Sequence, residues 1–240
     1  MTGSSRGIGF ALAQALAGAG AHVLLNGRDE AALARAVDTI AHAGGSAGIC
    51  AFDVTDPEAI DSAIARIEAE RPIDVLVNNA GIQRRAPLHE FDDADWRELM
   101  AINLDGVYFT SKRVARGMIS RGHGKIINIA SVQSELARPS IAPYTAAKGA
   151  VRNLTRGMCA DWAGLGLQAN AIAPGYFDTP LNAALVADPD FDGWIRKRTP
   201  AGRWGRLSDL HGVAIFLASS ASDFVNGQTI FIDGGITTVI

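Results

Sequence analysis

The chain has 240 residues, of which 48% are hydrophobic and 20% charged, so it has enough apolar material for a core and is no disordered chain. Its length favours one compact domain, and we treat residues 1–240 as a single unit. The 22 Lys and Arg against 25 Asp and Glu give a formal charge of −3 without a basic cluster. This balance argues against nucleic acid and anionic membranes as partners.

Two isolated cysteines, Cys50 and Cys159, lie in apolar surroundings and form neither a metal-ligand pair nor a disulfide framework. No apolar run reaches the length of a membrane span, and the N-terminus does not begin with a basic and then apolar segment. We therefore expect a cytoplasmic protein without a bound metal.

Short apolar runs rich in Val, Ile and Leu alternate along the chain with segments whose apolar residues recur every three or four positions. The runs predicted as strands are 22–26, 47–52, 74–78, 125–130, 167–173 and 228–232. Continuous apolar runs are typical of parallel strands buried on both faces. The sequence thus predicts a doubly wound α/β domain of the Rossmann type. The segment 175–204, interrupted by three prolines, is predicted to form a lid over the site.

A glycine-rich stretch at 2–9, Thr-Gly-Ser-Ser-Arg-Gly-Ile-Gly, runs directly into the first helical segment. Glycines let the backbone approach a pyrophosphate closely, and the N-terminus of the following helix offers free amide donors. The glycine spacing differs from the general dinucleotide fingerprint, so a simple turn is the alternative. The residues expected to touch a dinucleotide here are Gly3, Ser5, Arg6, Gly7, Ile8 and Gly9.

The residues at the end of the strand at 22–26 indicate which dinucleotide is preferred. A NAD-binding protein usually places an acid there for the ribose 2′-hydroxyl, but this chain has Gly27 and Arg28. Arg28, assisted by Arg6, can pair with a 2′-phosphate, so we predict NADP, with NAD as the weaker alternative. Asp29 follows directly and is interpreted as a helix N-cap.

Tyr144 and Lys148 are spaced by one helical turn, which places a phenol and an ammonium on the same helix face. A nearby cation is expected to lower the tyrosine pKa and to make Tyr144 a usable acid and base. Ser131 follows the strand at 125–130, at the edge where open α/β sheets bind their ligands. The pair alone also fits an amphipathic surface helix, but the combination with Ser131 is more specific.

Together with the glycine stretch, Asn-Asn-Ala-Gly at 78–81, Asn103 and Pro-Gly at 174–175, these residues resemble the short-chain dehydrogenase/reductase family along almost the whole chain. The resemblance implies that Asn103, Ser131, Tyr144 and Lys148 form a catalytic tetrad. It also implies cofactor contacts from Asp53, Val54, Asn79, Ala80 and Gly81, and from Pro174, Gly175 and Thr179 beside the nicotinamide. Tyr144 would exchange a proton with the substrate oxygen, Ser131 would hydrogen-bond that oxygen, and Lys148 would also hold the nicotinamide ribose. Asn103 would support a water that leads to Lys148. A homo-tetramer is implied in the same way.

The loops around this predicted site are rich in long polar side chains, which suit a small hydroxylated anion more than a steroid or acyl chain. Arg84, Arg85 or Arg138 could pair with a carboxylate, and Gln133 and Glu135 could bind hydroxyls. The residues that we place at the substrate are Arg84, Gln133, Glu135, Arg138 and Tyr176. These loops resemble the gluconate 5-dehydrogenase subfamily, which implies hydride transfer between NADP(H) and D-gluconate or 5-keto-D-gluconate. The alternatives are a 3-oxoacyl-carrier-protein reductase and a cofactor-binding protein without catalysis.

Family members have a buried strand before the glycine loop, whereas only Met1 precedes Thr2 here. We therefore expect a gap in the middle of the sheet, between the strands at 22–26 and 74–78, that the N-terminus does not fill. The glycine loop would lose its anchor. Either an upstream Val- and Leu-rich strand exists, or this 240-residue form is unstable and binds NADP poorly.

Overall fold

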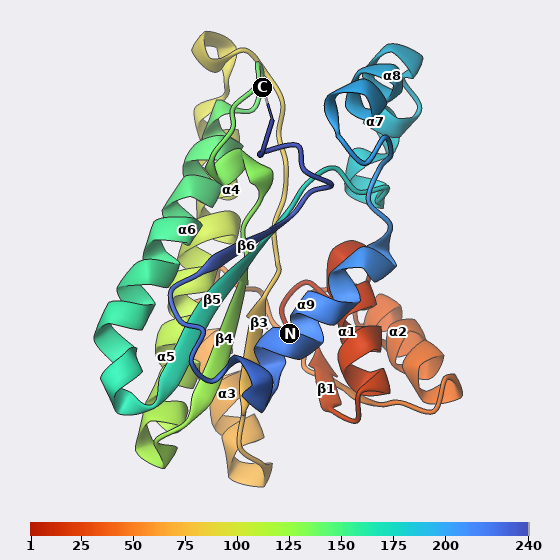
Figure 1. Cartoon of the computed structure of the whole chain (residues 1–240). Coiled ribbons are helices and arrows are strands. Elements are labelled where there is room, and N and C mark those ends of the chain that lie inside the picture. Colours follow the sequence, from red (N-terminus) through yellow and green to blue (C-terminus); the bar gives the residue numbers. More distant parts are fainter. Residues whose placement is uncertain (240) are drawn as a thin grey trace.

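Parallel strands form the centre of the computed structural model, which describes residues 1–239, and helices pack against both faces of these strands (Figure 1). The strands are β1 (His22–Leu25), β2 (Ser46–Ile49), β3 (Val75–Asn78), β4 (Gly124–Ile129), β5 (Leu167–Pro174) and β6 (Thr229–Ile232). The helices are α1 (Gly7–Gly18), α2 (Glu30–His42), α3 (Pro57–Glu70), α4 (Asp93–Met100), α5 (Gly106–Arg121), α6 (Ala142–Trp162), α7 (Ala183–Val186), α8 (Pro189–Arg198) and α9 (His211–Ala218). The six predicted strands are all present, and their ends lie within three residues of the predicted ones. The predicted α/β fold is confirmed.

The two faces of the sheet have separate hydrophobic cores because side chains alternate in direction along each strand. Val77, Ile127 and Ile172 point to one face and pack with α1, α2 and α9. Leu76, Ile126 and Ala171 point to the other and pack with α3, α5 and α6. Burial on both faces explains why the strands are apolar without alternation.

The strands are divided into two sheets, one with the order β1-β2 and one with the order β3-β4-β5-β6. A groove of about 490 Å³ lies between β1 and β3 and is lined by apolar side chains such as Val23 and Val75. The expected gap in the sheet is therefore confirmed.

The N-terminus fills one end of this gap, contrary to expectation. The Met1 ammonium donates to the Leu24 carbonyl at 2.8 Å, and the Met1 carbonyl accepts from Asn26 N at 3.1 Å. Thr2 N donates to the Val77 carbonyl at 2.9 Å. Two residues thus join the carboxyl ends of β1 and β3, so the expectation that the glycine loop lacks an anchor is wrong.

Aspartates act as N-caps at the starts of α2, α3, α4 and α8. Asp29 accepts a hydrogen bond from Ala32 N at 2.9 Å at the start of α2, which confirms its interpretation as a cap. Within residues 1–239, no helix has the length and apolarity needed to cross a membrane.

The segment predicted as a lid contains α7 and α8, which project beyond the carboxyl edge of the strands in Figure 1. Its aromatic residues gather around Tyr176, whose ring centroid lies 5.8 Å from that of Phe191 and 5.9 Å from that of Trp204. Trp204 Nε1 also donates to the Asp192 carboxylate at 2.7 Å. These contacts attach α8 to the residues that follow β5. Whether the segment 175–204 opens and closes as a lid stays a prediction.

Candidate functional site

A cleft of about 500 Å³ lies at the carboxyl edge of the strands, where parallel sheets bind their ligands. Most residues predicted to bind a cofactor line it: Gly3, Ser5, Arg6, Gly7, Ile8, Gly9, Arg28, Asp53, Val54, Asn79, Ala80, Gly81, Tyr144, Lys148 and Thr179. Pro174 and Gly175 line an adjoining hollow. The structure therefore brings the predicted cofactor-binding residues together at one edge of the strands.

The glycine loop packs so tightly that side chains are excluded at two of its positions. Gly3 has a φ of +60°, and a Cβ there would lie 2.7 Å from Ala80 Cα. A Cβ on Gly9 would lie 2.4 Å from both Asn79 Nδ2 and the Gly3 carbonyl oxygen. Asn79 Nδ2 donates to that Gly3 carbonyl at 2.7 Å, which locks the loop to the end of β3. The backbone is thus held close to the N-terminus of α1, where amide donors suit a pyrophosphate.

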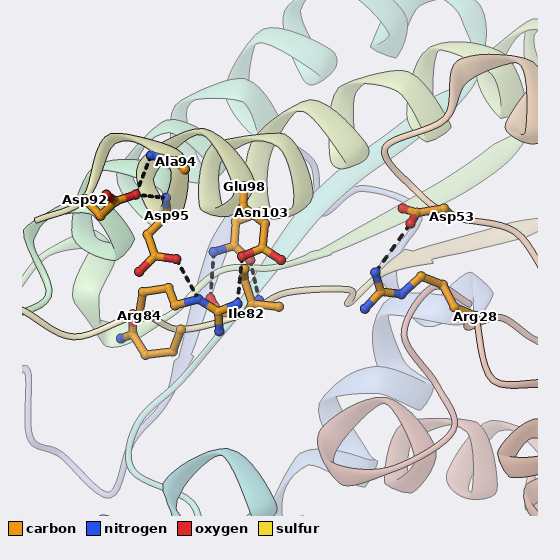
Figure 2. Close-up of polar contacts among 10 residues, drawn as sticks. Arg28, Asp53, Ile82, Arg84, Asp92, Ala94, Asp95, Glu98 and Asn103 are labelled. Carbon is orange, nitrogen blue, oxygen red and sulfur yellow. Dashed lines mark hydrogen bonds and ion pairs between the residues drawn. The ribbon is translucent and has the colours of Figure 1, made fainter.

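Arginines gather at the end of the cleft beside α2. Arg28 lies at the cleft and its Nη1 is 3.6 Å from Asp53 Oδ2, an open pairing that leaves most of the guanidinium exposed (Figure 2). A second hollow of about 530 Å³ continues outward and is shared by Arg6, Arg28 and Arg35. Sequence reasoning missed Arg35, which lies in the second turn of α2 and lines the same hollow as Arg6 and Arg28. This concentration of cations suits a phosphate group.

Tyr144 and Lys148 lie one turn apart near the start of α6, beside Ser131 at the end of β4. Lys148 Nζ lies 5.6 Å from the centroid of the Tyr144 ring and donates to the Ile129 carbonyl at 2.7 Å. Ser131 accepts a hydrogen bond from Gln133 N at 3.2 Å, which orients its side chain in the adjoining hollow. The predicted proximity of these three side chains is present in the fold.

Burial governs the protonation of this pair. It raises the pKa of Tyr144 to about 12, against a hydrogen bond with Ser131 that acts in the opposite direction. Burial also lowers the pKa of Lys148 to about 8. The neighbouring cation was expected to lower the pKa of Tyr144. In the chain without a bound ligand this expectation is wrong, because the loss of water around the phenol outweighs the charges nearby. At neutral pH Tyr144 is a protonated phenol and can act as a proton donor.

Asn103 lies in a π-helical turn, Ala101–Asp105, between α4 and α5. Its side chain is buried and faces the loop after β3: Oδ1 accepts from Ile82 N at 2.8 Å and Nδ2 donates to the Ile82 carbonyl at 2.9 Å (Figure 2). A wide π turn of this kind is common at functional sites. The amide thus holds the floor of the cleft, and its expected support of a water near Lys148 stays a prediction.

The adjoining hollow, of about 90 Å³, is next to Ser131 and Tyr144 and carries the polar side chains expected for a substrate. Its lining includes Gln83, Arg85, Gln133, Arg138 and Tyr176. Gln133 Nε2 donates to the Tyr176 hydroxyl at 3.3 Å, and the Arg138 guanidinium stacks 5.4 Å from the centroid of the Phe191 ring. Burial, together with the charge of Arg138, lowers the pKa of Arg85. Two guanidiniums thus face one small space, which favours an anion between them.

Two residues predicted to touch the substrate lie elsewhere. Arg84 turns away from the hollow and pairs with Asp95 at 3.2 Å and Glu98 at 2.7 Å on α4. Glu135 pairs with Arg152 on α6. Each long side chain meets an opposite charge on a neighbouring helix, so the structure does not bring these two residues into the hollow. Arg85, the neighbour of Arg84, takes the place in the hollow that was assigned to Arg84.

Comparison with known proteins places these observations in context. Residues 3–237 match a family model described as "Enoyl-(Acyl carrier protein) reductase". Over 99% of its length, the chain is 57% identical to gluconate 5-dehydrogenase of Gluconobacter oxydans, of which it covers 93%. It is 48% identical to 5-keto-D-gluconate 5-reductase of Escherichia coli K12, with 100% of this chain and 95% of that protein covered. A crystal structure of a gluconate 5-dehydrogenase from Burkholderia cenocepacia, in complex with NADP and tartrate, superposes with a TM-score of 0.97 at 60% identity. The match covers 100% of this chain and 94% of that one.

Proposed function

Because this chain belongs to the short-chain dehydrogenase/reductase family, we propose that it is an oxidoreductase that transfers a hydride between NADP(H) and a sugar acid. The substrate pair that fits best is D-gluconate and 5-keto-D-gluconate. The observation that carries this proposal is the placement of Tyr144 at the junction of the dinucleotide cleft and a small hollow lined by Arg85 and Arg138. A proton donor thus lies between a site for phosphates and a site for a carboxylate.

The cleft fits NADP(H) in its shape and its charge. Glycine is required at Gly3 because a Cβ would collide with Ala80, and the space saved there suits a pyrophosphate at the start of α1. Arg6 and Arg28 present charge to a 2′-phosphate, and the strand end carries no acid that would repel it. The cofactor, when bound, supplies or accepts the hydride.

The chain's own side chains handle the proton and the oxygen. Tyr144 donates its phenolic proton to the carbonyl oxygen of a keto acid as reduction proceeds and takes it back in the reverse direction. Ser131 donates a hydrogen bond to the same oxygen and orients the carbonyl carbon. Lys148, buried beside Tyr144, keeps a positive charge near the phenol and binds ribose hydroxyls. Asn103 holds the cleft floor beneath them.

The two arginines account for selection of a sugar acid. A carboxylate can accept parallel hydrogen bonds from a guanidinium, and Arg85 and Arg138 both reach the hollow. Gln133 and Tyr176 offer donors and acceptors to hydroxyls of the same molecule. The binding of tartrate by the Burkholderia cenocepacia neighbour is consistent with this reading, since tartrate is itself a hydroxylated carboxylate.

Two features away from the site bear on assembly and location. Several large apolar side chains are exposed away from the site: Trp96, Tyr108, Leu165, Ile215 and Phe224. We propose that they lie in contacts of a homo-tetramer. The two cysteines are free and are not bonded to each other, which fits a reducing cytoplasm.

The decisive experiment is a substrate comparison with the purified chain. Oxidation of NADPH should be rapid with 5-keto-D-gluconate and absent with an acetoacetyl thioester. The opposite pattern would identify a 3-oxoacyl-carrier-protein reductase, a class that also includes a solved neighbour 38% identical to this chain. NADPH binding without turnover of either compound would identify a non-catalytic cofactor-binding protein.

A further inference from the structure

Two adjacent arginines after β3 have different surroundings. Arg85 lines the substrate hollow, whereas Arg84 reaches back to the carboxylates of Asp95 and Glu98 on α4 (Figure 2). Both arginines belong to one short segment without regular secondary structure, so its path decides where each guanidinium lies. What fixes that path therefore bears on substrate binding.

The segment 82–86 is attached to its surroundings at three points. The Asn103 amide binds both polar backbone groups of Ile82, and Ala86 N donates to the Ser140 carbonyl at 3.2 Å. Between these two ends, Arg84 donates from Nε to Asp95 at 3.2 Å and from Nη2 to Glu98 at 2.7 Å. Arg85 lies one residue beyond this central attachment.

Helix α4 is a firm base for the attachment. Asp92 caps its first turn and accepts hydrogen bonds from Ala94 N at 2.7 Å and Asp95 N at 3.1 Å (Figure 2). Asp95 and Glu98 lie three residues apart and so present their carboxylates on one helix face. A guanidinium that binds two carboxylates through different nitrogens has its direction fixed.

Building on the function proposed above, we propose that Arg84 is a positioning residue: its ion pairs with Asp95 and Glu98 hold the segment 82–86 against α4 and thereby direct Arg85 to the substrate carboxylate. Arg84 itself does not touch the substrate. Its side chain is about two-fifths exposed, as are those of its partners, so each pair contributes modestly and is weakened by salt.

The test compares three variants by the KM for 5-keto-D-gluconate. Arg84→Met removes the charge and keeps the length of the side chain, and the double variant D95N/E98Q removes the partners and leaves Arg84 in place. We expect each to raise this KM by roughly two- to tenfold, while kcat and the Kd of NADPH stay within about twofold. Combining all three substitutions should add nothing, because they break the same contact. Arg97→Met is the matched control, since Arg97 pairs with Asp93 on the same helix at 3.8 Å and should leave the KM unchanged.

A rise in KM for R84M without a rise for D95N/E98Q would overturn the proposal, because Arg84 would then act on the substrate directly. Unchanged KM values in both would overturn it as well. Amide hydrogen exchange provides a readout that does not depend on the substrate. Exchange at residues 82–86 should be faster in R84M than in R97M. Equal exchange rates would refute the attachment of this segment to α4, whichever substrate the chain acts on. If the wild-type chain fails to reduce the keto acid while exchange behaves as expected, the proposed function fails and the attachment stands.

Discussion

Replacement of Lys148 by Met should change how the stability of the chain depends on pH. Lys148 is only 4% exposed, and burial lowers its pKa from 10.5 to about 8. The unfolded chain therefore binds a proton at Lys148 more tightly than the folded chain does. Between about pH 8 and pH 10.5 the unfolded state holds more protons, so the free energy of unfolding rises with pH in that window.

The size of the effect follows from the two pKa values. The difference between 10.5 and about 8 corresponds to roughly 3 kcal/mol of destabilisation that is fully present below about pH 8. Methionine removes this cost but leaves the Ile129 carbonyl without the donor it has at 2.7 Å, a loss of about 1–2 kcal/mol. Lys148→Met should thus be more stable than the wild type by about 1–2 kcal/mol near pH 7, equal to it between about pH 9 and 10, and less stable by about 1 kcal/mol near pH 10.5. Tyr144 does not affect this difference: because its pKa is raised from 10 to about 12, it lowers the free energy of unfolding only as the pH approaches 10 and rises further, and it does so in both proteins alike.

Urea unfolding of the cofactor-free chain at several pH values between about 7 and 10 measures this difference. The free energies of unfolding of the wild type and of Lys148→Met should converge as the pH rises and cross between about pH 9 and 10, while turnover is lost in the variant. Lys112→Met is the control, because Lys112 is exposed on α5 and should give a curve parallel to the wild type. Parallel curves for Lys148→Met as well would refute the reasoning, since they would mean that folding does not desolvate this ammonium.

Three further predictions concern the cofactor, the proton and the sheet. Tyr144→Phe should lower turnover by about 10²–10⁴-fold while fluorescence titration shows that NADPH still binds; near-normal turnover would remove Tyr144 from the mechanism. Arg28→Asp should shift the ratio of kcat/KM values from NADPH towards NADH, and an unmoved ratio would assign the 2′-phosphate to Arg6. An apolar Val- and Leu-rich strand joined ahead of Met1 should occupy the groove between β1 and β3 and raise the thermal unfolding midpoint by several degrees, so an unchanged midpoint would contradict this use of the groove.

Local patterns were sufficient for the elements and for the central side chains of the site. Continuous apolar runs identified the strands because these strands are buried on both faces. The spacing of Tyr144 and Lys148 placed both on one face of α6, since helical geometry alone decides that relation. Asp29 was interpreted as the N-cap of a helix and not as a ligand of the ribose, and the hydrogen bond that it accepts from Ala32 N confirms the cap.

The directions of long charged side chains were beyond such patterns. Arg84 is bound by acids 11 and 14 residues further along the chain, and Glu135 is bound by Arg152 on another element. Each of these partners is close only after the elements have packed. Sequence reasoning therefore named Arg84, Arg85 and Arg138 as candidates for a carboxylate but could not tell that Arg85 and Arg138 line the hollow and Arg84 does not.

Burial also reversed the expected electrostatics of the central pair. The sequence showed a cation beside a phenol, from which a lowered pKa follows only if both groups keep their water. In the folded chain both groups lose it, so each favours its neutral form: the phenol holds its proton to about pH 12 and the ammonium gives up its proton near pH 8. A protonated Tyr144 suits donation to a keto acid directly, whereas the reverse reaction requires the phenol to give up its proton first. The Tyr144–Lys148 spacing therefore does not by itself supply the lowered phenol pKa that oxidation of a hydroxyl group would use.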